Sequence, residues 1–209
     1  MTVHLQSTLF GSAERPRLGP LDALRRLELG LGAWVDVLPG WLAGADEVFE
    51  FLAGAVPWRA ERRAMYERVV DVPRLLAHYG DGVALPHPVL TEARRALGEH
   101  YAAELGEPFT TAGLCYYRDG RDSVAWHGDR GGRAAHQDTM IAILSLGEPR
   151  TLLLRPHHGP GPTHRHALGH GDLLVMGGSC QRTFDHAVPK TARPTGPRIS
   201  VQFRPHRVW

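Results

Sequence analysis

The chain has 209 residues, 43% of them hydrophobic, and a formal net charge of +2, which fits one globular domain with a sizeable core. A charge this close to neutral permits a nucleic-acid partner without requiring one. The two cysteines, Cys115 and Cys180, exclude a disulfide framework and a zinc-finger pattern. No apolar run approaches membrane-spanning length and no signal segment is recognisable, so we expect a cytoplasmic monomer without membrane contact.

Three regular segments are predicted in the first half of the chain. Residues 31–42 indicate a strand that a Pro-Gly turn ends. Residues 46–54 favour a short helix, because two acidic residues stand at the positive end of its dipole and apolar residues follow. Residues 91–105 are the clearest predicted helix, with Thr91 as the N-terminal cap and a glycine and a proline beyond its end.

Residues 57–81 differ in composition from their surroundings. Several arginines are interleaved there with Trp58, Tyr66 and Tyr79, and such a mixture suits a surface that pairs with phosphates and stacks on bases. The alternative is an ordinary solvated helix with its aromatic side chains in the core, since four acidic residues dilute the positive charge. The composition supports both interpretations equally.

After residue 108 the sequence consists of short apolar runs separated by glycine- and proline-rich turns. Eight strands are predicted, at residues 111–117, 123–127, 139–146, 151–155, 164–168, 172–176, 183–187 and 198–204. Strands of this number and length favour a double-stranded β-helix, or jelly roll. The expected fold is α+β, a single domain over residues 1–209 with a helical extension at 1–107 and a jelly-roll core at 108–209. The run at 139–146 is apolar on both faces, so we expect both faces to be covered.

A histidine followed two positions later by an aspartate is the motif with the clearest chemical meaning. The chain has 13 histidines and contains the pattern three times, at His127/Asp129, His136/Asp138 and His170/Asp172. On a strand, His127 and Asp129 would point to the same face, because side chains alternate with period two. The pair at 170 stands before an apolar run and suits a turn in which Asp172 bonds local backbone. The pair at 136 suits a loop.

A second histidine from a distant strand would complete a metal site. His186 lies in such a strand, and with His127 and Asp129 it would occupy one triangular face of an octahedral metal. The three open positions are typical of a non-haem Fe(II) centre, which must hold a co-substrate and dioxygen at the same time. The alternative for His186 is a hydrogen-bonded structural histidine.

The predicted strand at 198–204 carries a polar stripe. Arg198, Ser200, Gln202 and Arg204 share one face, and the apolar residues between them share the other. Burial of two arginines is costly unless an anion pairs with them, and the planar guanidinium makes two parallel hydrogen bonds to a carboxylate. The stripe therefore indicates a clamp for the two ends of a keto-diacid. The alternative is a solvated edge strand.

Several short motifs follow one another in a fixed order along the chain: Pro73-Arg74, His78-Tyr79-Gly80-Asp81, Tyr117-Arg118-Asp119-Gly120, Trp126-His127-Gly128-Asp129, Leu144-Ser145-Leu146-Gly147, Gly171-Asp172-Leu173-Leu174-Val175-Met176-Gly177-Gly178, Gln181-Arg182, His186-Ala187-Val188-Pro189-Lys190 and the 198–204 run. In these motifs and their order the chain resembles the AlkB family of Fe(II)- and 2-oxoglutarate-dependent dioxygenases over roughly residues 70–204.

The resemblance implies the following functions, written as expectations. The iron ligands would be His127, Asp129 and His186. The 2-oxoglutarate-binding residues would be Tyr117, Arg198, Arg204, Cys115 and Ser200. Residues 57–81 would form a nucleotide-recognition lid, and the candidate substrate residues are Trp58, Tyr66, Arg74, Tyr79 and Trp126. With Fe(II), 2-oxoglutarate and O2, the expected reaction is oxidative demethylation of N-alkylated bases in DNA, such as 1-methyladenine or 3-methylcytosine, which releases formaldehyde, succinate and CO2. A base inside a duplex would first be flipped out.

Two positions depart from the family pattern. Cys115 replaces an asparagine that is common in the family, which affects one co-substrate contact. Gly131 stands where the nucleic-acid demethylases usually carry an acidic residue that helps to hold the damaged base. Gly131 favours a first alternative, the same chemistry on RNA, a protein or a small molecule. A second alternative, from another class, is a catalytically silent jelly-roll binding module whose histidines are structural.

Overall fold

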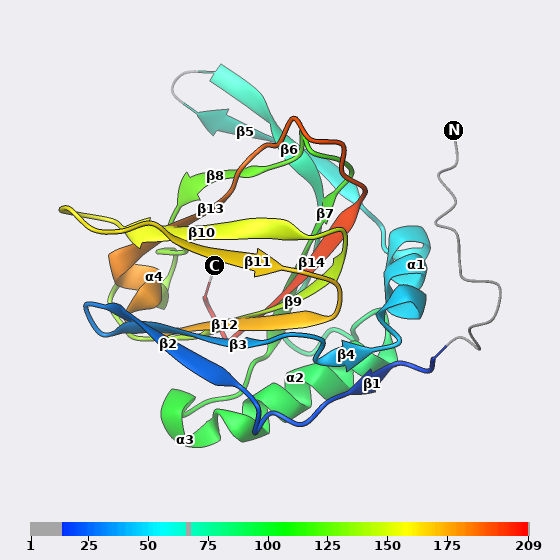
Figure 1. Ribbon diagram of the computed structural model, residues 1–209, viewed down its shortest axis with the longest axis horizontal. Helices are drawn as coiled ribbons and strands as arrows, with labels where there is room; N and C mark the ends of the chain where they lie inside the picture. The colour runs from blue at the N-terminus through cyan, green and yellow to red at the C-terminus, as the bar shows by residue number, and fades with distance from the viewer. Residues whose placement is uncertain (1–13, 66–67, 209) are drawn as a thin grey trace.

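Two antiparallel β-sheets that pack face to face make up most of the molecule in the computed structural model (Figure 1), which describes residues 14–65 and 68–208. The strands are β1 (Arg17–Leu18), β2 (Arg25–Gly30), β3 (Ala33–Leu38), β4 (Leu42–Ala43), β5 (Arg59–Met65), β6 (Arg68–Tyr79), β7 (Thr111–Tyr117), β8 (Val124–His127), β9 (Ile141–Gly147), β10 (Arg150–Pro156), β11 (His164–Leu168), β12 (Asp172–Gly178), β13 (Phe184–Val188) and β14 (Arg198–Arg204). The helices are α1 (Ala45–Ala55), α2 (Pro88–His100), α3 (Ala102–Leu105), α4 (Cys180–Thr183) and a 3-10 turn, η1 (Arg133–Ala135). No helix in this part of the chain is long and apolar enough to cross a membrane.

The sheet order is that of a jelly roll, as predicted. The larger sheet runs β2-β3-β12-β9-β14-β7-β6-β5 and the smaller one runs β11-β10-β13-β8. All eight strands expected after residue 108 are present, and three of them, β7, β11 and β14, have the predicted bounds. The first half of the chain adds β2 and β3 to one edge of the larger sheet and β5 and β6 to the other, and sequence analysis had predicted only the strand that became β3.

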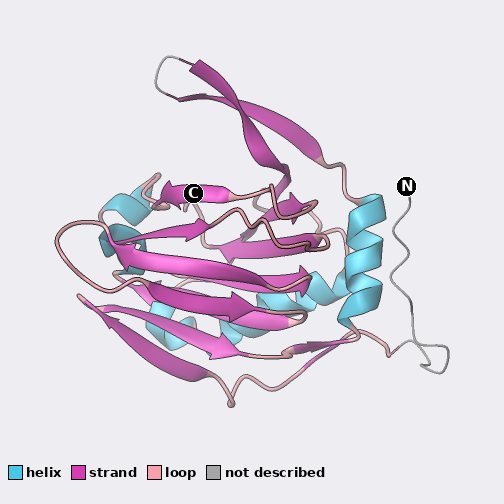
Figure 2. Ribbon diagram, turned by 45° about the horizontal axis from the view of Figure 1, so that its top comes forward, coloured by secondary structure: helices cyan, strands magenta, loops and turns pink. Residues whose placement is uncertain are grey.

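The larger sheet separates two apolar cores. Its inner face meets the smaller sheet, and its outer face is covered by α1 and α2 (Figure 2). Strand β9 is apolar throughout because its two faces lie in different cores. Ile141 and Ile143 lie in the inner core, whereas Ala142, Leu144 and Leu146 lie in the outer one. A central strand of this kind has no solvent-exposed face, which confirms the expectation for this run.

The long helix begins earlier than predicted. It starts at Pro88, and the side chain of His87, rather than Thr91, caps it by accepting a 3.2 Å hydrogen bond from the backbone N–H of Val89. Proline is favoured at the first helical position because a backbone N–H at this position has no acceptor within the helix, so its absence in proline costs nothing. The chain then ends α3 at Gly106, whose left-handed backbone (φ 74°) is typical of a helix C-terminus.

Residues 57–81 form a β-hairpin, so the predicted solvated helix is wrong, whereas the expectation that its aromatic side chains lie in the core is confirmed for Trp58 and Tyr79. Strands β5 and β6 pair with each other, and the second half of β6 pairs with β7 from Leu75 to Tyr79. Backbone pairing with a strand already in the sheet outweighs local helix propensity, and Pro73 would interrupt a helix in any case. The hairpin projects from one edge of the larger sheet (Figures 1 and 2). The predicted substrate residue Tyr66 lies outside the described residues.

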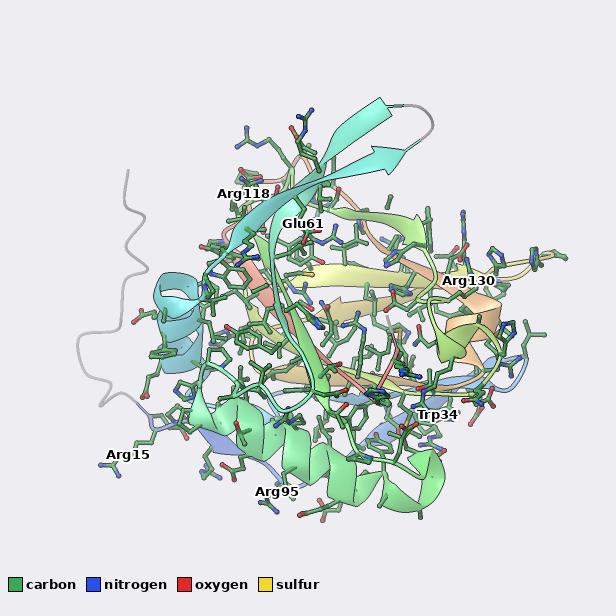
Figure 3. The ribbon with its side chains drawn as sticks, turned by 180° about the vertical axis from the view of Figure 1, so that it is seen from behind. Arg15, Trp34, Glu61, Arg95, Arg118 and Arg130 are labelled. Atoms are coloured by element: carbon green, nitrogen blue, oxygen red, sulfur yellow. The ribbon has the colours of Figure 1, made fainter. Side chains whose placement is uncertain are left out.

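A buried carboxylate ties the β2–β3 hairpin to the end of α2. Asp36 is 3% exposed and accepts two 2.8 Å hydrogen bonds from Arg26 and one of 2.8 Å from the hydroxyl of Tyr101. The guanidinium of Arg26 also lies 3.5 Å from the ring centroid of Trp34. Figure 3 shows Trp34 on the side of the sheet where α3 lies. These contacts hold the first strands against the helical layer.

We expect Asp36→Ala to lower the free energy of unfolding by about 3 kcal/mol, because it leaves Arg26 and Tyr101 without their buried acceptor. Urea unfolding followed by circular dichroism would measure the change. The matched control is Glu99→Gln, which breaks an ion pair with Arg95 whose two side chains are more than 60% exposed, and which we expect to have almost no effect. If both variants lost the same free energy of unfolding, Asp36 would not have the stabilising role given to it here.

Candidate metal centre and co-substrate pocket

The end of β8, the loop after it and the middle of β13 bring three candidate ligands together. His127 and His186 are directly opposite each other in the β8–β13 ladder, with ring centroids 4.2 Å apart. Nε2 of His127 lies 3.4 Å from Oδ1 of Asp129. One ligand atom from each of His127, Asp129 and His186 lies within 4.8 Å of the other two, and this is the one such group in the part of the chain that the structure describes.

Asp129 reaches this group by a different route from the one predicted. Strand β8 ends at His127, so Asp129 lies in the following loop and not on the same strand face. Its side chain is held from the larger sheet instead, where Nη2 of Arg204 donates a 3.0 Å hydrogen bond to Oδ2. A β-bulge also interrupts the ladder between His186 and Val188, and bulges of this kind re-aim side chains near functional sites.

The protonation states suit a cation. Burial lowers the pKa of His186 to about 4, so its imidazole is neutral at neutral pH and has a free nitrogen lone pair. Burial would raise the pKa of Asp129, but the charge of Arg204 and the proximity of His127 outweigh it and keep this pKa well below its usual value. Nδ1 of His127 lies 2.9 Å from the carbonyl of Ala125, and a bond between them leaves Nε2 for the metal.

The other two histidine–aspartate pairs lie in the turn and loop expected for them. Asp172 accepts a 2.7 Å hydrogen bond from the backbone N–H of Gly169 and a 2.8 Å one from that of Gly40, so it organises two turns. Asp138 lies in the loop after η1 and pairs with Arg182. Neither aspartate belongs to a convergent ligand group.

A buried arginine lies deeper between the sheets, at the start of β14. Arg198 is 2% exposed and directly opposite Tyr117 in the ladder, with its guanidinium 5.2 Å from the ring centroid. Its Nε donates a 2.9 Å hydrogen bond to Oγ of Ser145, whereas Nη1 is buried and has no partner among the described residues. Burial raises the pKa of Tyr117 to about 12, so its hydroxyl stays protonated and able to donate. An anion between these groups would satisfy the unpartnered N–H.

The rest of the stripe leads from Arg198 to the candidate ligands. Nε2 of Gln202 donates to Oγ of Ser200 at 2.8 Å and lies 3.5 Å from Sγ of Cys115. Oε1 of Gln202 accepts a 3.4 Å hydrogen bond from Arg204. Ser200, Cys115 and Ser145 are opposite one another across β14, β7 and β9, so one polar row crosses the inner face of the sheet.

Sequence reasoning did not single out three residues of this pocket. Ser145 binds Arg198, and a serine inside an otherwise apolar run was the available signal. Gln202 lay on the predicted polar face but was given no role. Arg150 is 5% exposed and donates to the carbonyls of three residues in the loops beside the pocket (Asp119, Asp122 and Pro189), and nothing local marks such contacts.

Gly113 leaves the space that Arg204 occupies. A Cβ at position 113 would lie 2.9 Å from Nη1 of Arg204 and 3.3 Å from Oε1 of Gln202. We therefore expect Gly113→Ala to displace the guanidinium from Asp129 and to weaken divalent-metal binding about tenfold, as the loss of a group that orients a ligand does. Calorimetric titration with Mn²⁺ would measure this. Gly98→Ala, on α2, where a Cβ meets only one atom at 4.0 Å, is the control.

The candidate substrate residues are spread over different faces. Trp58 packs on Tyr116 at 5.2 Å and donates a 3.1 Å hydrogen bond to the carbonyl of Leu52, so it belongs to the outer core, and Tyr79 packs against the same core. Trp126 alternates with His127 and lies 4.2 Å from the guanidinium of the exposed Arg155, on the outer face of the smaller sheet. The structure thus does not bring these three aromatic side chains to the ligand group.

Arg74 lies nearer the pocket. It is half-buried on β6, and its Nη1 donates a 3.1 Å hydrogen bond to the carbonyl of Ser123, in the segment that leads into β8. Its positive charge also acts on the hydroxyl of Tyr117. Among the described candidates for substrate binding, this is the one beside the co-substrate pocket.

Comparison with known proteins agrees with this geometry. A family model described as the 2OG-Fe(II) oxygenase superfamily matches residues 77–208. The fold and the ligand group are thus those of a 2-oxoglutarate- and Fe(II)-dependent oxygenase. The solved structure of OsALKBH1 superposes with a TM-score of 0.60 at 16% identity, covering 88% of this chain and 100% of that one, which supports the fold.

Two relatives show to which family within this superfamily the chain belongs. The alpha-ketoglutarate-dependent dioxygenase alkB homolog 3 of Bos taurus is 31% identical, over 81% of this chain and 65% of its own length. The DNA oxidative demethylase ALKBH2 of Arabidopsis thaliana is 31% identical, over 94% of this chain and 74% of its own length. The chain belongs to the AlkB family. It spans about 65% of the length of the first of these relatives.

The residues present fit the groups that this family implies, which are Fe(II), 2-oxoglutarate and O2. Two imidazoles and a carboxylate are the donor set of a non-haem iron, and they leave positions open. The orphaned N–H of Arg198 suits one carboxylate of a diacid. The side chain of His127 is 41% exposed, so the ligand group is open to solvent on one side.

Proposed function

We propose that this protein is an Fe(II)- and 2-oxoglutarate-dependent dioxygenase that removes methyl groups from N-alkylated bases of the 1-methyladenine and 3-methylcytosine type in DNA. The observation that carries the proposal is the convergence of His127, Asp129 and His186 at one end of the β14 stripe, whose other end holds the buried guanidinium of Arg198. Membership of the AlkB family supports the nucleic-acid substrate, and one relative is named a DNA oxidative demethylase.

Each part of the pocket has a distinct task in this proposal. His127, Asp129 and His186 hold Fe(II), which with bound 2-oxoglutarate and dioxygen supplies the oxidation of an N-methyl group. Arg198 and the hydroxyl of Tyr117 bind the far carboxylate of 2-oxoglutarate and orient it.

The overall reaction balances without a further reductant. One oxygen atom of O2 enters the methyl group, the other enters succinate, and 2-oxoglutarate loses CO2. The N-hydroxymethyl product then releases formaldehyde and a proton, and the ring nitrogen of the unmethylated base regains its lone pair.

The β5–β6 hairpin serves as the nucleotide-recognition lid in this proposal. It projects from one edge of the larger sheet (Figure 1), and the arginines of its first strand whose side chains the structure describes, Arg59 and Arg62, are exposed. Arg62 pairs with Asp71 across the hairpin at 3.1 Å, so part of its charge is compensated. Phosphate contacts of this kind are weakened by salt, and we expect binding of single-stranded DNA to fall with ionic strength.

A second candidate substrate class keeps the same chemistry. Gly131 has no side chain with which to hold a cationic base, and Trp58 and Tyr79 lie in the outer core and cannot stack on one without rearrangement. These two observations favour RNA, a protein or a small molecule as the alternative. A catalytically silent binding module is the alternative from another class, and it predicts that the histidines bind no iron.

One turnover assay distinguishes the DNA demethylase, the oxygenase with another substrate and the silent binding module. The protein would be incubated with Fe(II), ascorbate, 2-oxoglutarate and a single-stranded oligonucleotide that carries 1-methyladenine or 3-methylcytosine, and oligonucleotide mass and succinate would be measured together. Loss of the methyl group with an equal amount of succinate is the expected result. Succinate without demethylation would identify an oxygenase with another substrate. No succinate and no iron binding would contradict the enzyme assignment.

A further inference from the structure

The segment that carries Asp129 is not held by the strand ladder. Backbone pairing between β8 and β13 ends with His127 opposite His186, two residues before Asp129. From the larger sheet, Asp129 receives the side chain of Arg204. The spacing between Asp129 and His186 is therefore set by side-chain contacts, and a metal that binds both needs that spacing to be defined in advance.

A partly buried ion pair joins the two ligand-bearing segments directly. Arg130, next to Asp129, extends its guanidinium to Asp185, next to His186, and Nη2 lies 2.8 Å from Oδ1. The side chain of Asp185 is only 12% exposed and that of Arg130 is 30% exposed. Figure 3 shows Arg130 on the side of the molecule where α4 and the end of β8 lie.

A third residue holds the carboxylate from the other side. Nδ1 of His157, directly after β10, lies 3.1 Å from both oxygens of Asp185. The backbone N–H of His157 also donates a 2.8 Å hydrogen bond to the carbonyl of Thr183. Asp185 is thus fixed within the smaller sheet, and Arg130 is the group that brings the loop to it.

The glycine between the two ligands makes this geometry accessible. A Cβ at position 128 would lie 2.2 Å from Nη1 of Arg130 and 2.6 Å from its Cζ, so the guanidinium folds back directly over Gly128. The backbone of Gly128 is not left-handed, so conformation does not require glycine there. The requirement comes from the space that Arg130 fills.

We propose that Arg130 and Asp185 form a clasp that positions Asp129 and His186 relative to each other for metal binding. Both are positioning residues, because their side chains contact each other rather than the metal or the substrate. The inference rests on the metal site of the proposed function, and it adds a determinant of that site that lies outside the ligand set.

The test is a titration with Mn²⁺ alone, followed by the electron paramagnetic resonance signal of the free ion, which requires no turnover. Three variants open the clasp in different ways. Arg130→Met and Asp185→Asn each remove one charge, whereas Gly128→Ala keeps both charges and displaces the guanidinium. We expect each to weaken Mn²⁺ binding about 10- to 100-fold, the range found when groups that orient metal ligands are lost.

The charges distinguish positioning from simple electrostatics. Arg130→Met removes a positive charge near a dication, and Coulomb's law alone would then tighten Mn²⁺ binding. Asp185→Asn removes a negative charge and would weaken it. Weaker binding in both variants follows only from positioning. The double variant Arg130→Met/Asp185→Asn should bind Mn²⁺ no more weakly than either single variant does, because the two side chains act as one unit.

The control is Asp138→Asn, which breaks the ion pair of the same loop with Arg182 at an aspartate whose side chain is 58% exposed. We expect it to leave Mn²⁺ affinity unchanged, and melting of the metal-free proteins verifies folding. If the wild type binds Mn²⁺ and the clasp variants bind it equally well, or if Asp138→Asn weakens binding as much as they do, the clasp is refuted and the metal site remains. If the wild type itself binds no Mn²⁺, the proposed function fails and the clasp with it.

Discussion

His186→Ala is expected to abolish turnover of 2-oxoglutarate and to weaken divalent-metal binding by more than about a hundredfold, beyond the effect of losing an outer partner. The reason is that His186 supplies one of three ligand atoms, and its burial keeps the imidazole neutral at neutral pH. Iron content of the purified protein and succinate production would be measured side by side.

A matched histidine tests the specificity of this result. His166, on β11, lies in the same sheet, is half-buried, and pairs with Leu152 of the inner core, but it does not belong to the ligand group. We expect His166→Ala to retain iron and turnover. Equal iron content in the wild type and in His186→Ala would contradict the assignment of the metal centre.

The second large effect is expected at Arg198. Arg198→Met should raise the KM for 2-oxoglutarate about a hundredfold or more, because it removes a buried, charge-assisted contact to a carboxylate. Arg198→Lys should recover part of the affinity, since lysine keeps the charge but cannot make two parallel hydrogen bonds. Steady-state kinetics with varied 2-oxoglutarate would give both values, and an unchanged KM in Arg198→Met would exclude the proposed pocket.

The same substitution gives an independent readout in stability. Without ligand, Arg198 buries a charged group with one N–H unpartnered among the described residues, which costs free energy. We therefore expect metal-free Arg198→Met to melt no lower than the wild type. Addition of 2-oxoglutarate with Mn²⁺ should stabilise the wild type by mass action and leave the variant almost unaffected. A general packing defect would instead lower both melting temperatures.

Much of the jelly roll was readable from local patterns. Strands β7, β11 and β14 have the bounds that alternation and turn residues predicted, and β9 is buried on both sides as its composition indicated. The convergence of His127, Asp129 and His186 was also predicted without coordinates, because the neighbouring sequence suited the other histidine–aspartate pairs to a turn and a loop and the motif order resembled the AlkB family. Periodicity and turn chemistry act over a few residues, so a sequence displays them directly.

The sequence by itself thus determined the fold class, the convergent ligand group and the polar face of β14. Only the tertiary structure decided that residues 57–81 form a hairpin, that Trp58 and Tyr79 face the outer core, and that Asp129 is held beyond the end of β8 by Arg204. It also revealed the clasp, whose members are 55 positions apart. These features depend on which distant segments pair, and pairing is decided by the packing of the whole sheet rather than by the local preference of any segment.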